Sequence, residues 1–180
     1  GWSDPATTER THDAMVDDLR ALLAATRVTG PLVLVGHSMG GLLVRRYAQR
    51  FPRDVRAAVL LDATPEAMLF TEAAAAERRA LVARIDAGLR AAVPGVPVVP
   101  MSASTPPEVM LAFTPEVLEA VKQEYAAIDR VPAPMRTDRG YGTLGDRPLV
   151  VVRRGRTATP PSAEDERWHA WQESLLSLSS

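Results

Sequence analysis

Hydrophobic positions in this chain follow two patterns that alternate along the sequence. Three short, continuous apolar runs predict buried strands at Leu32–Val35, Val55–Leu61 and Pro148–Val152. Apolar residues spaced three and four apart predict helices that begin near Thr11, which is the expected N-cap, and after Gly41. Apolar strands joined through helices by short connections are typical of a parallel sheet covered on both faces. The pattern therefore predicts an α/β fold.

Residues 64–142 break this alternation. Three helix starts here share a Thr N-cap, a Pro in the first turn and a Glu near the positive end of the helix. They begin at Thr64, Thr105 and Thr114. We therefore expect a core of residues 1–63 and 143–180, with a mostly helical insertion at 64–142 that forms a lid over the site.

Two further groups of apolar residues lie outside the predicted strands. The first group lies in the predicted lid, and its members are Met68, Leu69, Phe70, Met101, Met110, Leu111 and Phe113. These side chains either line an apolar pocket or pack the lid against itself. The second group forms a stripe on a last helix that begins at Ser162, and its members are Trp168, Trp171, Leu175 and Leu178. We predict that both tryptophans belong to the core rather than to a ligand platform.

The segment Gly36-His37-Ser38-Met39-Gly40 lies between the first strand and the helix that follows it. A Gly-x-Ser-x-Gly turn in this context is typical of a nucleophile elbow, which lifts a serine hydroxyl above the sheet. Its glycines leave room for the helix to cross close over the strand. The bare motif arises by chance in about one chain in twenty of this length, so the specificity lies in the flanking strand and helix. Ser38 is the candidate nucleophile, and the alternative is a small residue in a tight turn.

A carboxylate follows the next predicted strand. Ser38 comes directly after the first strand and Asp62 directly after the second. In open parallel sheets the chemistry lies at the carboxyl ends of the strands. We therefore expect these two side chains to face the same cavity.

Composition excludes several classes of function. The net charge is -1 and charges of both signs are mixed along the chain, so no nucleic-acid footprint is present. There is no cysteine, and His12, His37 and His169 lack ligand spacing, so we expect neither a metal nor a cofactor. Apolar runs are much shorter than the roughly 18 residues of a membrane helix, so we expect no membrane association. The expected partner is a small-molecule substrate, and the residues indicate neither an oligomeric state nor a compartment.

Several segments together resemble the α/β-hydrolase fold superfamily, specifically the lid-bearing serine hydrolases of bacteria. Gly1–Pro5 resembles the Gly-x-Ser-Asp-Pro loop that follows the fourth strand of that family. Val16–Leu19, Val35–Gly41 and Val59–Ala63 are similar to its next landmarks, in the same order. Trp168–Ser179 resembles the helix before the final strand. The resemblance covers nearly the whole chain and implies a partial α/β-hydrolase fold, with a parallel sheet covered by helices and a helical lid insertion.

The resemblance implies hydrolysis or acyl transfer of an ester, thioester or similar small carbonyl substrate through an acyl-enzyme. The backbone N–H of Met39 is then one donor of the oxyanion hole. In this family the acid follows either of two strands. Asp62 follows the first of these strands. The alternatives come after the second strand and are Glu164, Asp165 and Glu166, which have the pattern of first-turn acids of a helix. We choose Asp62, while a loop carboxylate that caps a neighbouring N–H is the other interpretation.

The general base is the missing member of the triad. In the order Ser, acid, His, the histidine follows the last strand, so we expect it beyond Ser180. His37 shapes the turn in this family, His12 lies upstream, and His169 lies in the middle of a helix. We therefore expect an internal piece that also lacks the strands before Gly1. Its first strand then has an unpaired edge and exposed apolar surface, and the piece alone has little or no esterase activity.

Two other functions compete with this interpretation. A non-catalytic protein of the same fold that binds a ligand or partner is favoured if the gene lacks the downstream histidine. A cofactor-independent peroxidase or lyase on this scaffold is not separable by these residues. The serine at position 38 argues against haloalkane dehalogenase and epoxide hydrolase chemistry, because those members of the family use an aspartate there.

Overall fold

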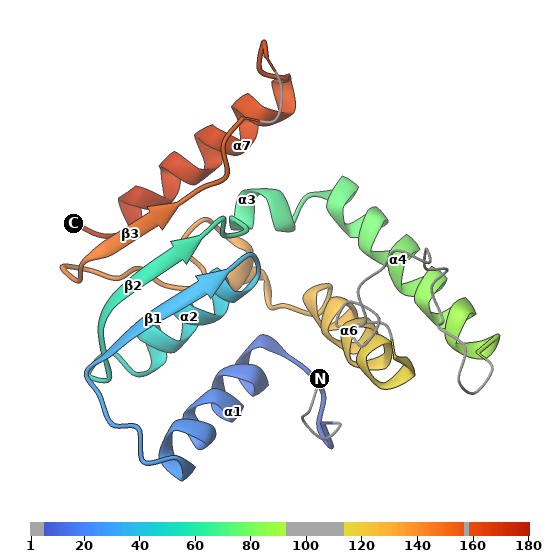
Figure 1. The fold of residues 1–180 in the computed structure, drawn as a ribbon, viewed down its shortest axis with the longest axis horizontal. Coiled ribbons are helices and arrows are strands. Elements are labelled where there is room, and N and C mark those ends of the chain that lie inside the picture. Colours follow the sequence, from blue (N-terminus) through green and yellow to red (C-terminus); the bar gives the residue numbers. More distant parts are fainter. Residues whose placement is uncertain (1–5, 93–113, 157–158) are drawn as a thin grey trace. The chain divides into compact units, whose positions relative to one another are not determined.

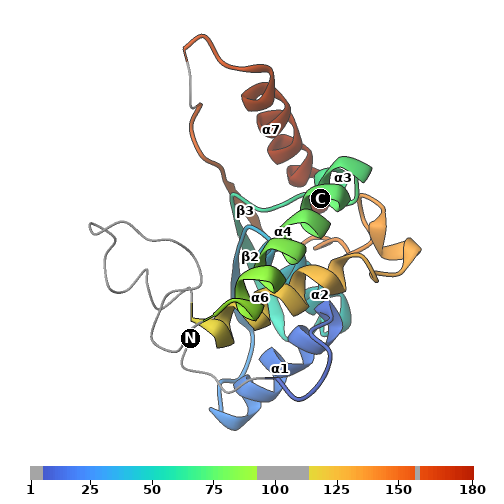
Figure 2. The ribbon, with the colours of Figure 1, turned by 90° about the vertical axis from the view of Figure 1, so that its right-hand side faces the viewer.

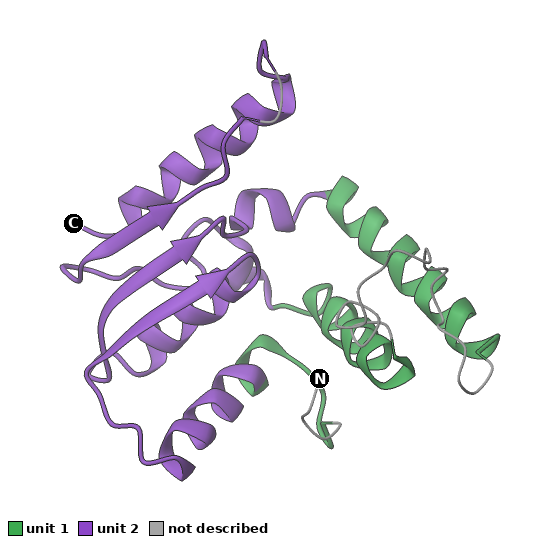
Figure 3. Cartoon of the chain, viewed as in Figure 1, with its two compact units in different colours: residues 1–14, 72–131 green, residues 15–71, 132–180 purple. Residues whose placement is uncertain are grey.

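The computed structural model describes residues 6–92, 114–156 and 159–180 (Figure 1). The chain divides into two compact units, one of residues 1–14 and 72–131 and one of residues 15–71 and 132–180, and each is described by itself (Figure 3). Several sequence predictions fall outside the described residues, namely those on Gly1–Pro5, Met101, Thr105, Met110, Leu111 and Phe113.

The second unit is built on a three-stranded parallel sheet. Its strands are β1 (Leu32–His37), β2 (Val55–Leu61) and β3 (Leu149–Val152), in the order β1-β2-β3. The three predicted strands and the α/β class are confirmed. The register pairs His37 with Leu61 and Leu61 with Val152, so all three strands end at the same level. Residues that follow these strands therefore lie side by side.

Helices α2 and η3 cover one face of this sheet. The helical elements of the unit are α1 (His12–Ala25, of which 15–25 belong here), α2 (Gly40–Arg50), α3 (Glu66–Leu69), η2 (Ala133–Arg136), α7 (Ala163–Ser174) and η3 (Leu175–Leu178). Figure 2 shows α2 running along one side of the strands. Val44 and Tyr47 of α2 form the core with Leu60 of β2 and Leu178 of η3. The apolar spacing of α2 places these side chains toward the sheet.

The opposite face of the sheet is apolar and exposed, so within the described residues the expectation that both faces are covered is wrong. Val33 and Val35 of β1 are 59% and 63% exposed, and Val150 of β3 is 53% exposed. Alternate residues of a strand point to opposite faces, and the register sets these side chains on the same face. Strand β1 also lies at the edge of the sheet. The predicted unpaired edge and exposed apolar surface of the first strand are confirmed.

The other unit pairs two helices, α4 (Glu72–Arg90) and α6 (Pro115–Ile128). Arg78 of α4 donates to Asp129 at 2.6 Å, and Lys122 of α6 donates to Asp86 at 3.3 Å. Both contacts join the two helices or their ends. No helix in the described ranges is long and apolar enough to cross a membrane.

Threonine caps two of the helices as predicted, and a third prediction is wrong. Thr11 Oγ1 accepts from Ala14 N at 3.1 Å at the start of α1, and Thr114 Oγ1 accepts from Val117 N at 3.4 Å at the start of α6. The N-cap of α3 is Pro65 rather than Thr64. The chain is extended at Pro65, so the helix begins one residue later than the pattern suggests and the Thr64 side chain is left for another contact.

Two glycines allow α2 to pass close to the ends of β1 and β2. A Cβ on Gly36 would lie 2.4 Å from Gly40 O, and one on Gly41 would lie 2.5 Å from Ala63 Cβ. A Cβ on Gly40 meets nothing within 4 Å. Close packing at the turn therefore depends on Gly36 and Gly41, whereas the motif pattern pointed to Gly36 and Gly40.

A buried ion pair ties α2 to α3. Arg45 Nη1 donates to Glu66 Oε2 at 2.6 Å, and both side chains are 1% exposed. The same guanidinium donates to Gly142 O at 3.0 Å from Nε and Nη2, and to Asp138 O at 3.3 Å. Four acceptor contacts satisfy a charge that is costly to bury alone. Arg45 therefore holds the start of α3 and the loop at 138–142 against the helix that follows the turn.

We expect Gly36→Ala to lower the free energy of unfolding by about 1–3 kcal/mol or to prevent folding, because the methyl group collides with a backbone carbonyl. Gly40→Ala is the matched control, and it should lie within about 1 kcal/mol of the wild type, on the stabilising side, because alanine favours helix. Urea unfolding of both variants in the full-length protein measures the difference. Equal stability of the two variants contradicts the close crossing at Gly36.

We expect Arg45→Met to lower the free energy of unfolding by about 3–5 kcal/mol, because it leaves the Glu66 carboxylate buried without its cation. Arg46→Met, on the same helix, removes an exposed hydrogen bond to Gln49 and should cost less than about 1 kcal/mol. Thermal and urea unfolding followed by circular dichroism compare the two variants. A small, equal loss in both shows that the buried pair is not needed for folding.

Candidate functional site

Ser38 occupies a strained turn between β1 and α2. Its φ is 51°, in the left-handed region that non-glycine residues rarely adopt. Ser38 N donates to Leu61 O at 3.1 Å, while Ser38 O accepts from Gly41 N at 3.0 Å and from Thr64 N at 3.1 Å. Strain of this kind costs about 1–3 kcal/mol and persists only where the surroundings fix it. The strand, turn and helix expected around Ser38 are all present.

The other elbow residues flank this turn. His37 is the last residue of β1, is exposed and makes no side-chain hydrogen bond within the described ranges. Met39 is the N-cap residue of α2, with helical φ and ψ of -56° and -27°. Backbone N–H groups at the first turn of a helix lack intrahelical acceptors. The Met39 N–H therefore belongs to the part of the helix that is able to donate to a ligand.

Asp62 lies at the equivalent place on β2. Its φ is 44°, and its N–H donates to Val152 O at 2.6 Å. Asp62 Oδ1 accepts from the backbone N–H of Arg154 at 3.1 Å and from Trp168 Nε1 at 2.8 Å. Asp62 Oδ2 lies 3.9 Å from Arg154 Nη1, and the side chain is 23% exposed. The carboxylate is thus fixed on one oxygen and accessible on the other.

Thr64 is a contact of Ser38 that the sequence pattern did not indicate. Its Oγ1 lies 3.4 Å from Ser38 Oγ, at the long limit of a hydrogen bond. Its N–H also donates to Ser38 O. The pattern assigned Thr64 to a helix cap, and only the extended backbone at Pro65 frees its hydroxyl for Ser38.

The alternative acids are first-turn residues of α7, as the sequence predicted. Asp165 forms a capping box with Ser162, in which Ser162 N donates to Asp165 Oδ2 at 3.2 Å and Asp165 N donates to Ser162 Oγ at 3.0 Å. Glu166 accepts from Arg156 Nε at 3.3 Å, and Glu164 is exposed. The Asp165 carboxylate thus already stabilises the start of α7, and the Glu166 carboxylate is already paired with the loop that carries Arg156.

Trp168 is buried, as predicted for a core residue, and it has a second role that its apolar spacing concealed. Its indole N–H donates to Asp62, and the Arg154 guanidinium lies 4.4 Å from the centre of its ring. Its neighbour one turn along α7, Gln172, donates to Ala63 O at 2.6 Å. Helix α7 therefore contacts the two residues that follow β2.

The histidines differ in their surroundings. Burial lowers the pKa of His12 to about 4, although the nearby Asp13 carboxylate acts in the opposite direction, so this imidazole is neutral at pH 7. His169, on α7, is buried, and neither of its ring nitrogens has a hydrogen-bond partner among the residues that the structure describes. Neither His37 nor His169 donates to Asp62 or Ser38 in the described structure. Among the described residues, no group of three or more His, Cys, Asp or Glu side chains could hold a metal ion.

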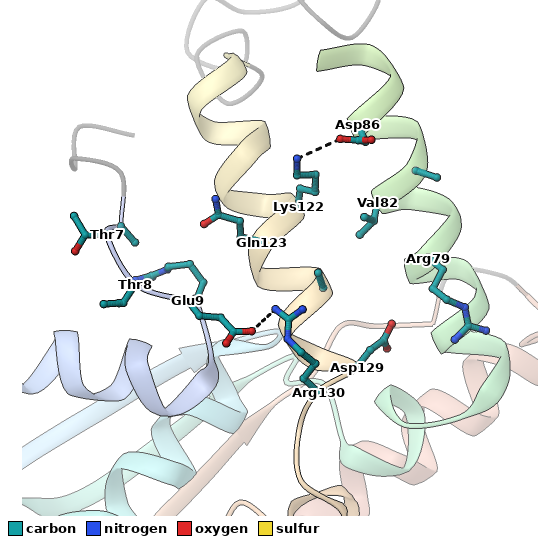
Figure 4. Close-up of a pocket in the computed structure, with 14 residues that line it drawn as sticks. Thr7, Thr8, Glu9, Arg79, Val82, Asp86, Lys122, Gln123, Asp129 and Arg130 are labelled. Carbon is teal, nitrogen blue, oxygen red and sulfur yellow. Dashed lines mark hydrogen bonds and ion pairs between the residues drawn. The ribbon is translucent and has the colours of Figure 1, made fainter. Parts of the chain in front are cut away.

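A cavity of about 830 Å³ lies in the unit that contains α4 and α6 (Figure 4). Its lining is partly apolar, with Val82, Ala83 and Ala126, and partly charged. The charged side chains are paired: Lys122 with Asp86, Arg130 with Glu9, Asp129 with Arg78 and Arg79 with Glu72. The hydrogen bond from Lys122 holds the pKa of the Asp86 carboxyl below its ordinary value. None of the site residues predicted from the sequence lines this cavity.

A curated protein is similar in sequence to about a third of this chain. An uncharacterized protein of Schizosaccharomyces pombe is 36% identical over 63 residues, which are 35% of this chain and 12% of that protein. The chain therefore spans about an eighth of the length of the curated relative that it matches.

Solved structures share the fold. A thermophilic esterase from Thermogutta terrifontis is 23% identical with a TM-score of 0.53, over 95% of this chain and 64% of that chain. An epoxide hydrolase of the alpha/beta hydrolase superfamily, from metagenomes of hot environments, is 16% identical with a TM-score of 0.56, over 99% of this chain and 67% of that chain. The family model of the alpha/beta hydrolase fold matches residues 1–92, more than half of the sequence. The chain belongs to the alpha/beta hydrolase fold family.

Proposed function

We propose that this chain carries the nucleophile and the acid of a serine hydrolase that acts on an ester, thioester or similar small carbonyl substrate. The observation that carries the proposal is the strained serine at the end of β1 beside a carboxylate at the end of β2. The fold likeness to an esterase supports the reaction class. The likeness to an epoxide hydrolase is one of fold, and the family resemblance implies an aspartate rather than a serine at position 38 for that chemistry.

In this mechanism Ser38 Oγ attacks the substrate carbonyl and its proton passes to a histidine base. A hydroxyl is a weak nucleophile at neutral pH, so the base is required. The Met39 N–H donates to the oxyanion that forms, because it lies at the start of α2 where a developing negative charge is stabilised. The tetrahedral intermediate then breaks its bond to the leaving alcohol or thiol, which takes the proton from the histidine. Water hydrolyses the acyl-enzyme with the same groups and releases the acid.

Asp62 orients the base in this proposal. Its position next to the end of β1 favours it over the acids of α7, because Asp165 is engaged in a capping box and Glu166 in an ion pair with Arg156. The histidines at positions 37 and 169 do not contact it, so we propose that the base comes from beyond Ser180. We propose further that the insertion at 64–142, which includes α4 and α6, serves as a lid and helps to select the substrate.

Reaction with a fluorophosphonate probe tests the proposal in the full-length protein. Mass spectrometry of the labelled protein should find the adduct on Ser38, and Ser38→Ala should abolish both labelling and hydrolysis of an activated ester. Ser177→Ala, which changes an exposed serine of η3, is the matched control and should react like the wild type. Asp62→Asn should slow labelling by roughly 10²-fold or more, because the base loses its orienting acid.

The same experiment separates enzyme from binding module. Labelling of Ser38 that disappears in Ser38→Ala supports a hydrolase. An unreactive Ser38 in a folded full-length protein favours the non-catalytic protein instead, in which the strained turn serves ligand or partner binding.

A further inference from the structure

The Asp62 carboxylate is held asymmetrically. Its Oδ1 receives two N–H groups, the Trp168 indole at 2.8 Å and the Arg154 backbone amide at 3.1 Å. Its Oδ2 has one cation at 3.9 Å, beyond hydrogen-bond distance. Two donors on one oxygen fix the rotation of the carboxylate about its Cβ–Cγ bond. The second oxygen is then left with its acceptor capacity for another group.

Trp168 is itself fixed on several sides. The capping box of Ser162 and Asp165 anchors the start of α7, six residues before Trp168. Gln172, four residues after Trp168 and therefore on the same side of the helix, donates to Ala63 O at 2.6 Å. The Arg154 guanidinium stacks on the indole at 4.4 Å. The indole N–H is thus directed at Asp62 by a helix that is also hydrogen-bonded to Ala63, the next residue.

We propose that Trp168 is a positioning residue for the catalytic acid, and that it presents Asp62 Oδ2 to the N–H of the histidine base. This inference rests on the proposed function, since it requires that Asp62 orients the base. A charge-assisted N–H donor stabilises the ionised carboxylate and fixes its direction. Arg154 contributes to the same arrangement through its backbone amide and through its contact with the indole ring.

A purely structural role for the indole N–H is the competing interpretation, because a buried tryptophan usually finds an acceptor. The tie between α7 and the end of β2 does not depend on it, because the Gln172 hydrogen bond to Ala63 O makes the same connection. What the indole adds is control of a carboxylate that remains 23% exposed. The two interpretations differ in the pH dependence of catalysis.

Trp168→Phe in the full-length protein tests the proposal, because it removes the N–H and keeps an aromatic ring. We expect kcat for an activated ester to fall roughly tenfold with KM nearly unchanged. The acid limb of the kcat/KM profile should move to higher pH by about half a unit to one unit. The sign follows because an Asp62 carboxylate without the indole donor offers more of its negative charge to the imidazolium of the base, which then keeps its proton to a higher pH.

Trp171→Phe is the matched control, since Trp171 lies on the same helix and its indole donates no hydrogen bond to Asp62 within the described residues. It should leave kcat and the acid limb as in the wild type. In an Asp62→Asn background, Trp168→Phe should have little further effect on kcat, because the group that it positions is already lost. An equal loss in both backgrounds, or a Trp168→Phe profile that matches Trp171→Phe, overturns the proposal.

Two further measurements keep the outcomes distinct. If Ser38→Ala retains activity, the proposed function fails and this inference fails with it. If Ser38→Ala is inactive and Trp168→Phe behaves like its control, only this inference fails. Should Trp168→Phe not fold, as judged by circular dichroism, incorporation of benzothienylalanine at position 168 removes the N–H while it preserves the shape of the indole, and the same kinetic outcomes decide.

Discussion

The level at which the three parallel strands end is the constraint on which the site depends. His37, Leu61 and Val152 lie in register, and the hydrogen-bond ladder continues one residue past them. Ser38 N donates to Leu61 O, and Asp62 N donates to Val152 O. Each of these residues then turns sharply, with φ of 51° and 44°. The positions of the serine and the carboxylate are therefore inherited from the sheet, and the strain of both turns is opposed by strand pairing.

Two supports hold the segment that follows β2. On one side the buried pair of Arg45 and Glu66 fixes the start of α3 to α2. On the other side Trp168 and Gln172 of α7 hold Asp62 and Ala63. A buried ion pair offsets its desolvation only when its geometry and its other hydrogen bonds are good, so it is better evidence for a fixed arrangement than for a large gain in stability. The segment that carries Asp62 and Thr64 is thus held in place by groups outside the sheet.

Local patterns were sufficient to predict the three strands, the strand, turn and helix around Ser38, and two of the three threonine caps that lie within the described residues. Each of these features depends on residues within a few positions of one another, which is the range that periodicity and turn chemistry describe. The contacts of Asp62 with Trp168 and of Ala63 with Gln172 span 106 and 109 residues, so no local pattern contains them. Trp168 illustrates the difficulty, because its apolar spacing correctly predicts burial and says nothing of where its N–H points. The role of Gly41 was not predicted for the same reason, since its neighbour Ala63 lies after β2, outside the local segment around Gly41.

A likeness in fold does not determine the chemistry of the turn that carries Ser38. An esterase and an epoxide hydrolase resemble this chain about equally in fold, with TM-scores of 0.53 and 0.56. The scaffold therefore cannot choose between the two reactions, because function lies in the residues of the site rather than in the fold. In this chain the side chain at the strained position is a hydroxyl. A hydroxyl needs a base to become a nucleophile, whereas a carboxylate is already ionised at neutral pH. Under the proposed function, the serine thus makes the orientation of Asp62, and with it the indole N–H of Trp168, matter to the reaction.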